Sequence, residues 1–407
     1  MTDTVGEGAA TSLWRNRDYT LFWGGRTVSA LGTSMSGFAF PLLILALTRS
    51  PALAGLGGGL RAVPYVLLSL PAGALVDRWD RKRVMLLCDA GRALTLASIP
   101  LAWWTAHLSL AQLYAATTVE GTLLLFYNTA NLASLPRLVP RARLATASAR
   151  DEGAYYAAGL LGPAVGGILY GIGRVLPFLA DALSYLFSLL SLLLIKTDLR
   201  REGAAARPRH IGAEMVEGLV WLWRQPIIRA VSLLDAAEVL VVSNLGLVVI
   251  VLAQRQHAPV ATIGTIFSIA GVGGVLGSIA GGYARKHLSF GWTMIGARWV
   301  LAALWPFYAL APTPLALGAV TAAIYALNPI KNVAYVSYCL PLIPEGLRGR
   351  VTTMWDLLPS ATAVAGATLT GLALQNIGPT ATVVVGAILL VALALVVTLN
   401  AHIRDAL

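Results

Sequence analysis

Charged side chains interrupt several long apolar segments of this sequence, and their types and spacing could support proton exchange. Glu120 stands near the middle of one such segment, with no basic residue beside it. Asp235 and Glu238 are three residues apart and share a helix face, where two carboxylates repel and one tends to hold a proton. These three acids are candidates for binding and releasing a proton. The alternative is structural: a hydrogen-bonded Glu120, and a carboxylate pair neutralised by Arg298 or Lys331.

Each ionisable group inside an apolar span is costly unless it faces a wet cavity or an opposite charge. Arg26 lies less than two turns from the end of its segment, so it either faces a cavity or extends to the membrane surface. We expect Arg61, Arg92 and Asp89 to form gating or inter-helix pairs rather than to bind a ligand. The complete set is Arg26, Arg61, Asp89, Arg92, Glu120 and Asp181, then Asp235, Glu238, Arg298, Lys331 and Asp356.

The elements that position these groups are long apolar runs. The chain has 407 residues, of which 57% are hydrophobic and 12% charged, whereas a soluble protein carries about 25% charged residues. Since a membrane-spanning helix needs about 20 apolar residues, the sequence predicts an all-α integral membrane protein with about twelve such helices in two six-helix halves. Their predicted ranges are 20–47, 52–76, 83–106, 110–134, 153–172, 176–195, 227–252, 260–283, 291–311, 314–338, 351–374 and 379–400.

The basic residues indicate how the chain is oriented. The net charge of +11 could suggest nucleic-acid binding, but the bases stand in short segments between apolar runs, so we expect no nucleic-acid partner. Loops on one side carry most of them, while the opposite loops carry only Arg49, Arg174 and Arg255. This bias predicts a multi-pass protein of the cytoplasmic (inner) membrane with both termini in the cytoplasm. The predicted domains are 1–195, a cytoplasmic linker over 196–226 with a short amphipathic helix near Glu214–Trp223, and 227–407.

Other kinds of site find little support in the sequence. Cys88 and Cys339 are far apart, and the histidines fall in loops or at span ends without an i, i+4 partner, so neither a disulfide nor a metal site is predicted. The glycine-rich segments fit no nucleotide-binding pattern and are expected to allow close helix packing. We therefore expect no cofactor, and no cleaved signal peptide because Met1–Arg17 lacks an apolar core.

One short loop carries a recognisable motif. Gly73–Val84 reads G-A-L-V-D-R-W-D-R-K-R-V, and it resembles the signature between the second and third helices of the major facilitator superfamily, G-x-L-x-D-R-x-G-R-[KR]. Asp80 stands where the signature usually has Gly, as in the efflux branch that includes macrolide-efflux and enterobactin-export proteins. In that family the motif gates the inner side, and its Asp meets the inner end of the eleventh helix, here Gly349–Thr353. The matching residues are Gly73, Leu75, Asp77, Arg78, Arg81 and Lys82.

The resemblance also implies which residues face the transport pathway. The run containing Gly162, Pro163, Gly166 and Gly167 resembles the fifth-helix signature of antiporters. Many proton-coupled relatives have an arginine in the fourth helix, and this chain has none there. In the family the first, fourth, seventh and tenth helices line the cavity, which selects Arg26, Ser29, Thr33, Glu120, Asn128, Asp235, Glu238, Asn244, Asn328 and Lys331.

The predicted function is therefore a secondary active transporter, not an enzyme, that exports a small amphiphilic or hydrophobic compound, antibiotic-like or siderophore-like, against an inward flow of protons. Its expected partners are a small-molecule substrate, protons and the lipid bilayer, and we expect a monomer. Two alternatives remain open at this point. One is a non-transporting sensor or assembly protein of the same fold, and the other is a membrane-embedded transferase, which would need a clustered catalytic motif.

Overall fold

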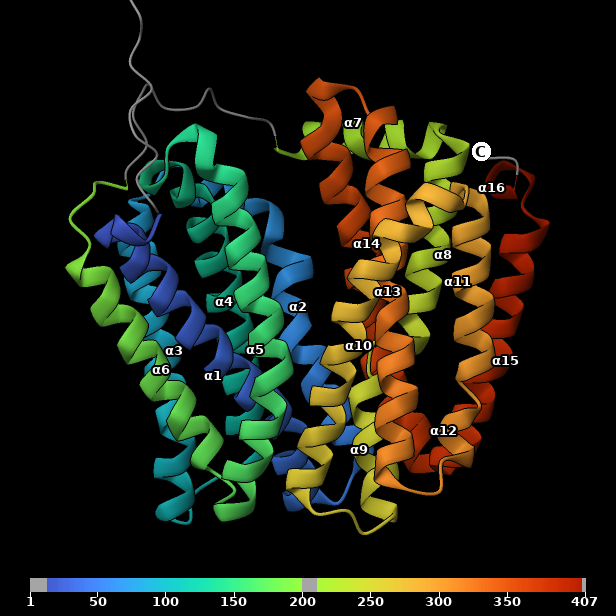
Figure 1. Cartoon of the computed structure of the whole chain (residues 1–407). Helices are drawn as coiled ribbons and strands as arrows, with labels where there is room; N and C mark the ends of the chain where they lie inside the picture. Colours follow the sequence, from blue (N-terminus) through green and yellow to red (C-terminus); the bar gives the residue numbers. More distant parts are fainter. Residues whose placement is uncertain (1–12, 200–210, 405–407) are drawn as a thin grey trace, which may run out of the picture.

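The computed structural model describes residues 13–199 and 211–404, and within these residues the chain is helical without a strand (Figure 1). The first group of helices comprises α1 (Arg17–Thr48), α2 (Pro51–Val76), α3 (Arg81–Trp104), α4 (Leu110–Leu138), α5 (Leu144–Ile172) and α6 (Leu176–Leu194). The second comprises α7 (Ile211–Arg224), α8 (Pro226–Val242), α9 (Leu245–Arg255), α10 (Val260–His287), α11 (Phe290–Leu304), α12 (Phe307–Leu310), α13 (Pro314–Leu342), α14 (Arg348–Asn376), α15 (Gly378–Leu399) and α16 (Ala401–Arg404). Short 3-10 helices lie at Leu13–Arg15, Arg141–Arg143 and Glu345–Leu347.

Within residues 13–199 and 211–404, twelve helical segments have the length of a membrane crossing, as the sequence predicts. In the described part of the chain, ten segments are also apolar enough by composition, with α8 and α9 taken together and α11 and α12 taken together. The other two are α4 and α13, each of 29 residues. They are less apolar because polar residues such as Glu120 on α4 and Lys331 on α13 lie within them. A polar helix is stable in a membrane when its polar face turns toward protein or a water-filled cavity.

Three predicted spans differ from the helices observed. α5 begins at Leu144 rather than near residue 153, because five of its first nine residues are polar or charged and a search for apolar runs passes over them. The seventh span is not one helix over 227–252, since it breaks after Val242, where the Asn244 side chain donates a hydrogen bond to the Ala367 carbonyl at 3.1 Å. The ninth span is interrupted before Pro306, which cannot donate the next helix hydrogen bond.

The turn between α2 and α3 explains one departure from the family signature. Asp80 is the N-cap of α3, and its carboxylate accepts hydrogen bonds from the backbone N–H groups of Lys82 at 3.0 Å and Arg83 at 3.3 Å. A capping carboxylate satisfies donors that the first helical turn leaves unpaired. The aspartate that replaces glycine here therefore stabilises the start of α3.

The long helices form two bundles, α1–α6 and α8–α15, which converge at the end away from α7 and diverge toward it (Figure 1). At the converging end the helix pairs α2–α14 and α5–α10 approach so closely that glycine is required. A Cβ atom at Gly55 would lie 2.6 Å from the Ala367 carbonyl oxygen, and one at Gly264 would lie 2.3 Å from that of Pro163. The side chains of Ser50 and Gln375 also form a hydrogen bond between the bundles there. The structure is thus closed at this end and open toward α7.

α7 crosses the open end of the second bundle (Figure 1), where the sequence predicts an amphipathic helix. Leu222 is buried in the core of that bundle, while Val216 and Trp223 are 59% and 49% exposed. Glu217 forms an ion pair with Arg350, and Gly218 packs against the backbone of the same arginine. α7 is therefore fixed to the first turn of α14, and an apolar face remains for the membrane surface. Residues 200–210 of the predicted linker lie outside the described residues.

Candidate functional site

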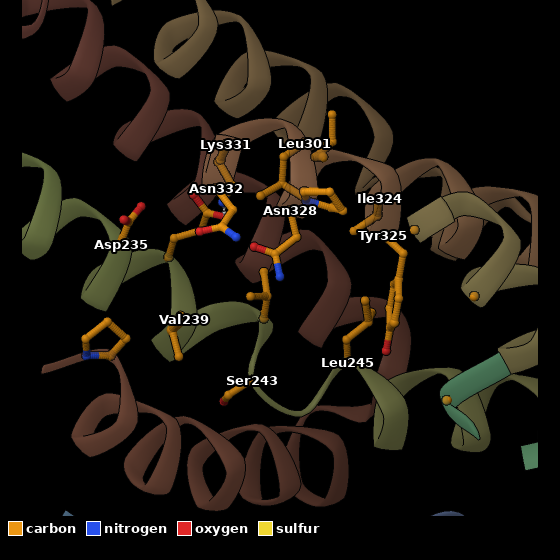
Figure 2. A pocket seen from close by; sticks show the side chains of 18 of the residues that line it. Asp235, Val239, Ser243, Leu245, Leu301, Ile324, Tyr325, Asn328, Lys331 and Asn332 are labelled. Carbon is orange, nitrogen blue, oxygen red and sulfur yellow. Dashed lines mark hydrogen bonds and ion pairs between the residues drawn. The ribbon is translucent and has the colours of Figure 1, made fainter. Parts of the chain in front are cut away.

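A cavity of about 830 Å³ lies between α5 of the first bundle and the helices of the second. Figure 2 shows α8, with Asp235 and Val239, on one side of it and α13, with Asn328 and Lys331, on another. The break between α8 and α9 also reaches the cavity, a place where non-helical backbone is tolerated inside a membrane. Apolar side chains make up much of the remaining wall, among them Phe267, Leu301, Ile324, Trp355 and Pro359.

A compact charge cluster, here called the cavity cluster, contributes three charged side chains to this wall and a buried arginine that pairs with the two acids among them. Its members are Asp235, Glu238, Arg298 and Lys331. Arg298 on α11 is only 2% exposed and contacts both acids, Asp235 at 2.5 Å and Glu238 at 3.4 Å. Lys331 on α13 forms an ion pair with Glu238. The cluster holds two acids and two bases, so their charges balance. In the open state the acid pair is therefore neutralised by Arg298 and Lys331.

A second charge cluster, here called the buried cluster, lies inside the first bundle and comprises Arg61, Asp89, Arg92, Glu120 and Asp181 with the hydroxyl groups of Thr33 and Tyr185. Glu120 on α4 is completely buried, and each of its carboxylate oxygens meets a guanidinium group. Oε2 accepts from Arg61 Nε at 2.9 Å, and Oε1 accepts from Arg92 Nη2 at 3.1 Å. The sequence placed no base next to Glu120 because both partners come from other helices, α2 and α3. Glu120 therefore faces the interior of the first bundle.

Arg92 connects Glu120 to α1 and α6. Its Nη2 atom also donates to Thr33 Oγ1 at 2.9 Å and to the Tyr185 hydroxyl at 2.6 Å, and the guanidinium lies 3.9 Å from the centre of the Tyr185 ring. Tyr185 in turn contacts Asp181, which accepts further hydrogen bonds from Ser36 and Ser184. The sequence pattern missed Tyr185, because an aromatic residue in an apolar span carries no signal that distinguishes it from packing.

Arg26 has a partner that the sequence analysis did not propose. It forms an ion pair with Asp151 on α5, whose side chain is 9% exposed. Asp151 was absent from the candidates because the predicted fifth span began two residues after it. The pair joins α1 to α5 near the open end, so Arg26 does not need to extend to the membrane surface.

The remaining cavity candidates are dispersed. Asn328 lines the cavity, whereas Asn244 donates its hydrogen bond to α14 at the helix break. Ser29 is buried in α1, and Asn128 on α4 is exposed. Of the ten residues selected from the resemblance, Asp235, Glu238, Asn328 and Lys331 thus lie together on the cavity wall, and Thr33 and Glu120 belong to the buried cluster.

The gating motif binds the start of α3 to its neighbours. Asp77, the C-cap of α2, lies 3.6 Å from Arg81. Arg81 also donates to the Ala133 carbonyl of α4 at 2.7 Å, and Lys82 donates to the Ile195 carbonyl after α6 at 2.6 Å. In this open state Arg81 and Lys82 therefore attach the motif to α4 and to the residue that follows α6. A Cβ atom at Gly73 would meet no atom within 4 Å.

The glycine–proline run of α5 lies at a three-helix contact. A Cβ atom at Gly162 would lie 2.4 Å from Ser34 Cβ on α1, and one at Gly167 would lie 2.9 Å from the Val260 carbonyl oxygen on α10. Gly166 packs similarly on Met35, and α5 remains helical through Pro163. The run therefore lets α5 contact both α1 of its own bundle and α10 of the other.

The composition of the cavity wall indicates which kind of solute it can bind. In the described residues, no group of three or more His, Cys, Asp and Glu side chains could hold a metal ion. The cavity instead offers large apolar surfaces beside two carboxylates, an ammonium group and two amides, the composition expected for a small amphiphilic ligand.

Comparison with known proteins identifies the family. The sequence pattern of the Major Facilitator Superfamily matches residues 22–330. The multidrug efflux pump Tap of Mycolicibacterium fortuitum is 25% identical over 361 residues, which cover 84% of this chain and 85% of the pump. The enterobactin exporter EntS of Shigella boydii serotype 4 (strain Sb227) is 25% identical over 353 residues, covering 85% of this chain and 82% of the exporter.

Solved structures show the same fold. The nucleoside transporter NupG (D323A mutant) superposes with a TM-score of 0.77 at 14% identity, covering 93% of this chain and 99% of the transporter. At this identity the likeness concerns the fold alone.

Proposed function

The chain belongs to the Major Facilitator Superfamily, and from this we propose that it is a proton-coupled exporter of a small amphiphilic compound. The observation that carries the proposal is the cavity between the two bundles, with the cavity cluster on its wall and apolar surfaces around it. The relatives named as a multidrug efflux pump and an enterobactin exporter support the direction of transport and the substrate class. In this proposal the chain performs no catalysis and acts as a monomer.

Alternating access follows from the way the bundles meet. Residues 1–195 and 227–407 act as two bodies joined by the segment 196–226, and the bound solute lies between them. The glycine contacts of α2 with α14 and of α5 with α10 hold the closed end together. Transport requires these contacts to loosen while the bundles close at the α7 end.

The open end is cytoplasmic in this proposal. It carries α7, the Asp77–Lys82 motif and most of the basic loop residues, and basic loops are retained on the cytoplasmic side. Both chain termini then lie in the cytoplasm, and the cavity receives its solute from there or from the inner leaflet.

Purified protein in proteoliposomes tests the function. Labelled antibiotics and siderophores are offered with and without a pH gradient. We expect at least one amphiphilic compound to accumulate against its gradient only when the pH gradient is present. A chain that binds no compound of the panel, or transports one without response to pH, would contradict proton-coupled export.

Three variants address the acids selected from the sequence: Glu120→Gln, Asp235→Asn and Glu238→Gln. Counterflow of substrate down its own gradient is expected to survive in at least one of them while pH-driven accumulation fails. If all three variants still accumulate substrate as the parent does, these acids have structural roles.

A further inference from the structure

The buried cluster contains more acids than bases. Arg61 and Arg92 supply two positive charges, while Glu120, Asp181 and Asp89 supply three carboxyl groups, all of them 0% exposed. Two carboxylates balance two guanidinium groups, and an additional buried carboxylate without a counter-charge would be very costly. One of the three carboxyl groups must therefore hold a proton in this structure.

Hydrogen bonding indicates which one. Glu120 accepts from both guanidinium groups, and Asp181 accepts from Ser36 at 2.5 Å, Ser184 at 3.1 Å and Tyr185 at 3.2 Å. Such donors stabilise the ionised form of a carboxyl group. In contrast, neither oxygen of Asp89 has a hydrogen-bond partner among the described residues, and its nearest cation contact is Arg92 Nη1 at 3.9 Å. Asp89 is thus the group with least support for a negative charge.

The side chains around Asp89 offer no further base. α1 contributes the Thr33 hydroxyl to the cluster, and α2 contributes Arg61. On α6, Ser188 faces Asp89 outside hydrogen-bond geometry and lies 3.4 Å from the Tyr127 hydroxyl of α4. Among the described residues, the charged and titratable groups around the site include Arg61 on α2, Cys88 and Arg92 on α3, Glu120 and Tyr127 on α4, and Asp181 and Tyr185 on α6.

The second bundle serves as an internal comparison. Arg298 on α11, like Arg92 on α3, is a nearly fully buried arginine on the third crossing of its bundle. Three residues before Arg92 stands Asp89, whereas three residues before Arg298 stands the apolar Ile295. α15, the sixth crossing of the second bundle, has no acid to match Asp181. The additional carboxyl group is therefore a feature of the first bundle and not a requirement for burying an arginine at this place.

Arg92 has unused capacity on the side of Asp89. Its Nη2 atom donates to Thr33, Glu120 and Tyr185, while its Nε atom is buried without an acceptor among the described residues. Asp89 and Arg92 are three residues apart on one helix and share a face. An ionised Asp89 would attract this guanidinium group and weaken its bond to Glu120.

We propose that Asp89 is the proton-binding group of this transporter and that Arg92 is its switch. In the state open toward α7, Asp89 is a neutral carboxylic acid and Arg92 binds Glu120, Thr33 and Tyr185. When the Asp89 O–H bond breaks, the proton passes to water. The new Asp89 carboxylate then forms an ion pair with Arg92, and Glu120 keeps only its ion pair with Arg61. Because 27% of the Arg61 side chain is exposed, this exchange connects the protonation of a buried acid to a partly exposed guanidinium group.

The inference rests on the proposed proton-coupled export, but its test requires no transport. Infrared difference spectra of the purified protein, titrated with pH in the absence of substrate, report the carbonyl band of a protonated carboxyl group. We expect one such band in the parent, shifted by carbon-13 aspartate, lost in Asp89→Asn and retained in the matched control Asp235→Asn. Asp89→Glu, which keeps the acid, is expected to keep a band that no longer responds to labelled aspartate.

Absence of the band in the parent, or its persistence in Asp89→Asn, would overturn the proposal. So would a band in Asp89→Glu that still shifts with labelled aspartate, since it would belong to another aspartate. If Asp89→Asn fails to fold, the labelled-aspartate shift and the Asp89→Glu variant decide the assignment. If the band belongs to Asp89 but transport does not respond to pH, Asp89 is a proton-binding site and proton-coupled export is wrong. Conversely, if transport is driven by pH but the band belongs to another residue, proton-coupled export is supported and the assignment of Asp89 is wrong.

Discussion

Lys331 on α13 and Glu238 on α8 form an ion pair on the wall of the central cavity, and Arg298 lies behind Glu238 at 3.4 Å. The pair is only partly desolvated on the Lys331 side, where 16% of the side chain is exposed. A solute in the cavity can therefore compete for Lys331 without leaving Glu238 unpaired. This relationship makes the cavity cluster both a structural element and a candidate solute contact.

Removing one member of this pair is expected to cost more than removing both. Loss of a partner from a buried ion pair costs about 3–5 kcal/mol, and the second partner of Glu238 lowers that value here. We expect Lys331→Met to decrease the melting temperature of the purified protein, and Lys331→Met combined with Glu238→Gln to recover most of the loss. Equal melting temperatures for the single and double variants would show that the two residues are not coupled.

The close approach of α2 and α14 at Gly55 should determine which end of the protein is closed. A Cβ atom there would lie 2.6 Å from a backbone oxygen and 2.8 Å from Gly371 Cα, so the helices must separate to accept a larger residue. We expect Gly55→Val to shift the protein toward opening at the end opposite α7. Spin-label distances across that end measure the shift, with Gly24→Ala as control, since a Cβ atom at Gly24 meets nothing within 4 Å. Unchanged distances in Gly55→Val would contradict the prediction.

Asp77 should act when the α7 end closes. In the open state it lies near Arg81, and closure would bring it toward the first turn of α14, whose N-terminus favours a negative charge. We expect Asp77→Asn to fold normally, to populate the closed α7 end less, and to transport more slowly at equal membrane abundance. The same spin-label distances, placed across the α7 end, would reveal this shift. A transport rate equal to the parent's would argue against a gating role.

The membrane orientation can be measured directly. Cys88 and Cys339 are buried and can be replaced by alanine to give a background without reactive thiols. Leu288→Cys, between α10 and α11, and Leu315→Cys, in the first turn of α13, introduce exposed positions at opposite ends of the fold, since the native side chains are 53% and 71% exposed. We expect an impermeant thiol reagent added to intact cells to label position 315 and to spare position 288. The reverse labelling would invert the orientation proposed above.

The sequence by itself determined the helical membrane fold. Apolar runs of sufficient length predict spanning helices, because the free energy of moving each residue from water into the bilayer depends mainly on that residue and not on its tertiary contacts. The motif around Asp77 and the intramembrane charges were equally visible, because polar residues stand out against an apolar background. Helix ends could not be read from apolar runs where polar residues continue a span, as in the first turns of α5, or where a side chain breaks one, as at Asn244.

Only the tertiary structure decided which charges neutralise one another. Glu120 has no base near it in the sequence, yet α2 and α3 bring Arg61 and Arg92 to its two oxygens. Asp235 and Glu238 receive their cations from α11 and α13, and Arg26 receives Asp151 from α5. Pairing between helices depends on their packing and rotation, which no local pattern encodes. Asp89 became distinctive for the same physical reason, because a carboxyl group without a partner can be recognised only after all of its neighbours have been placed.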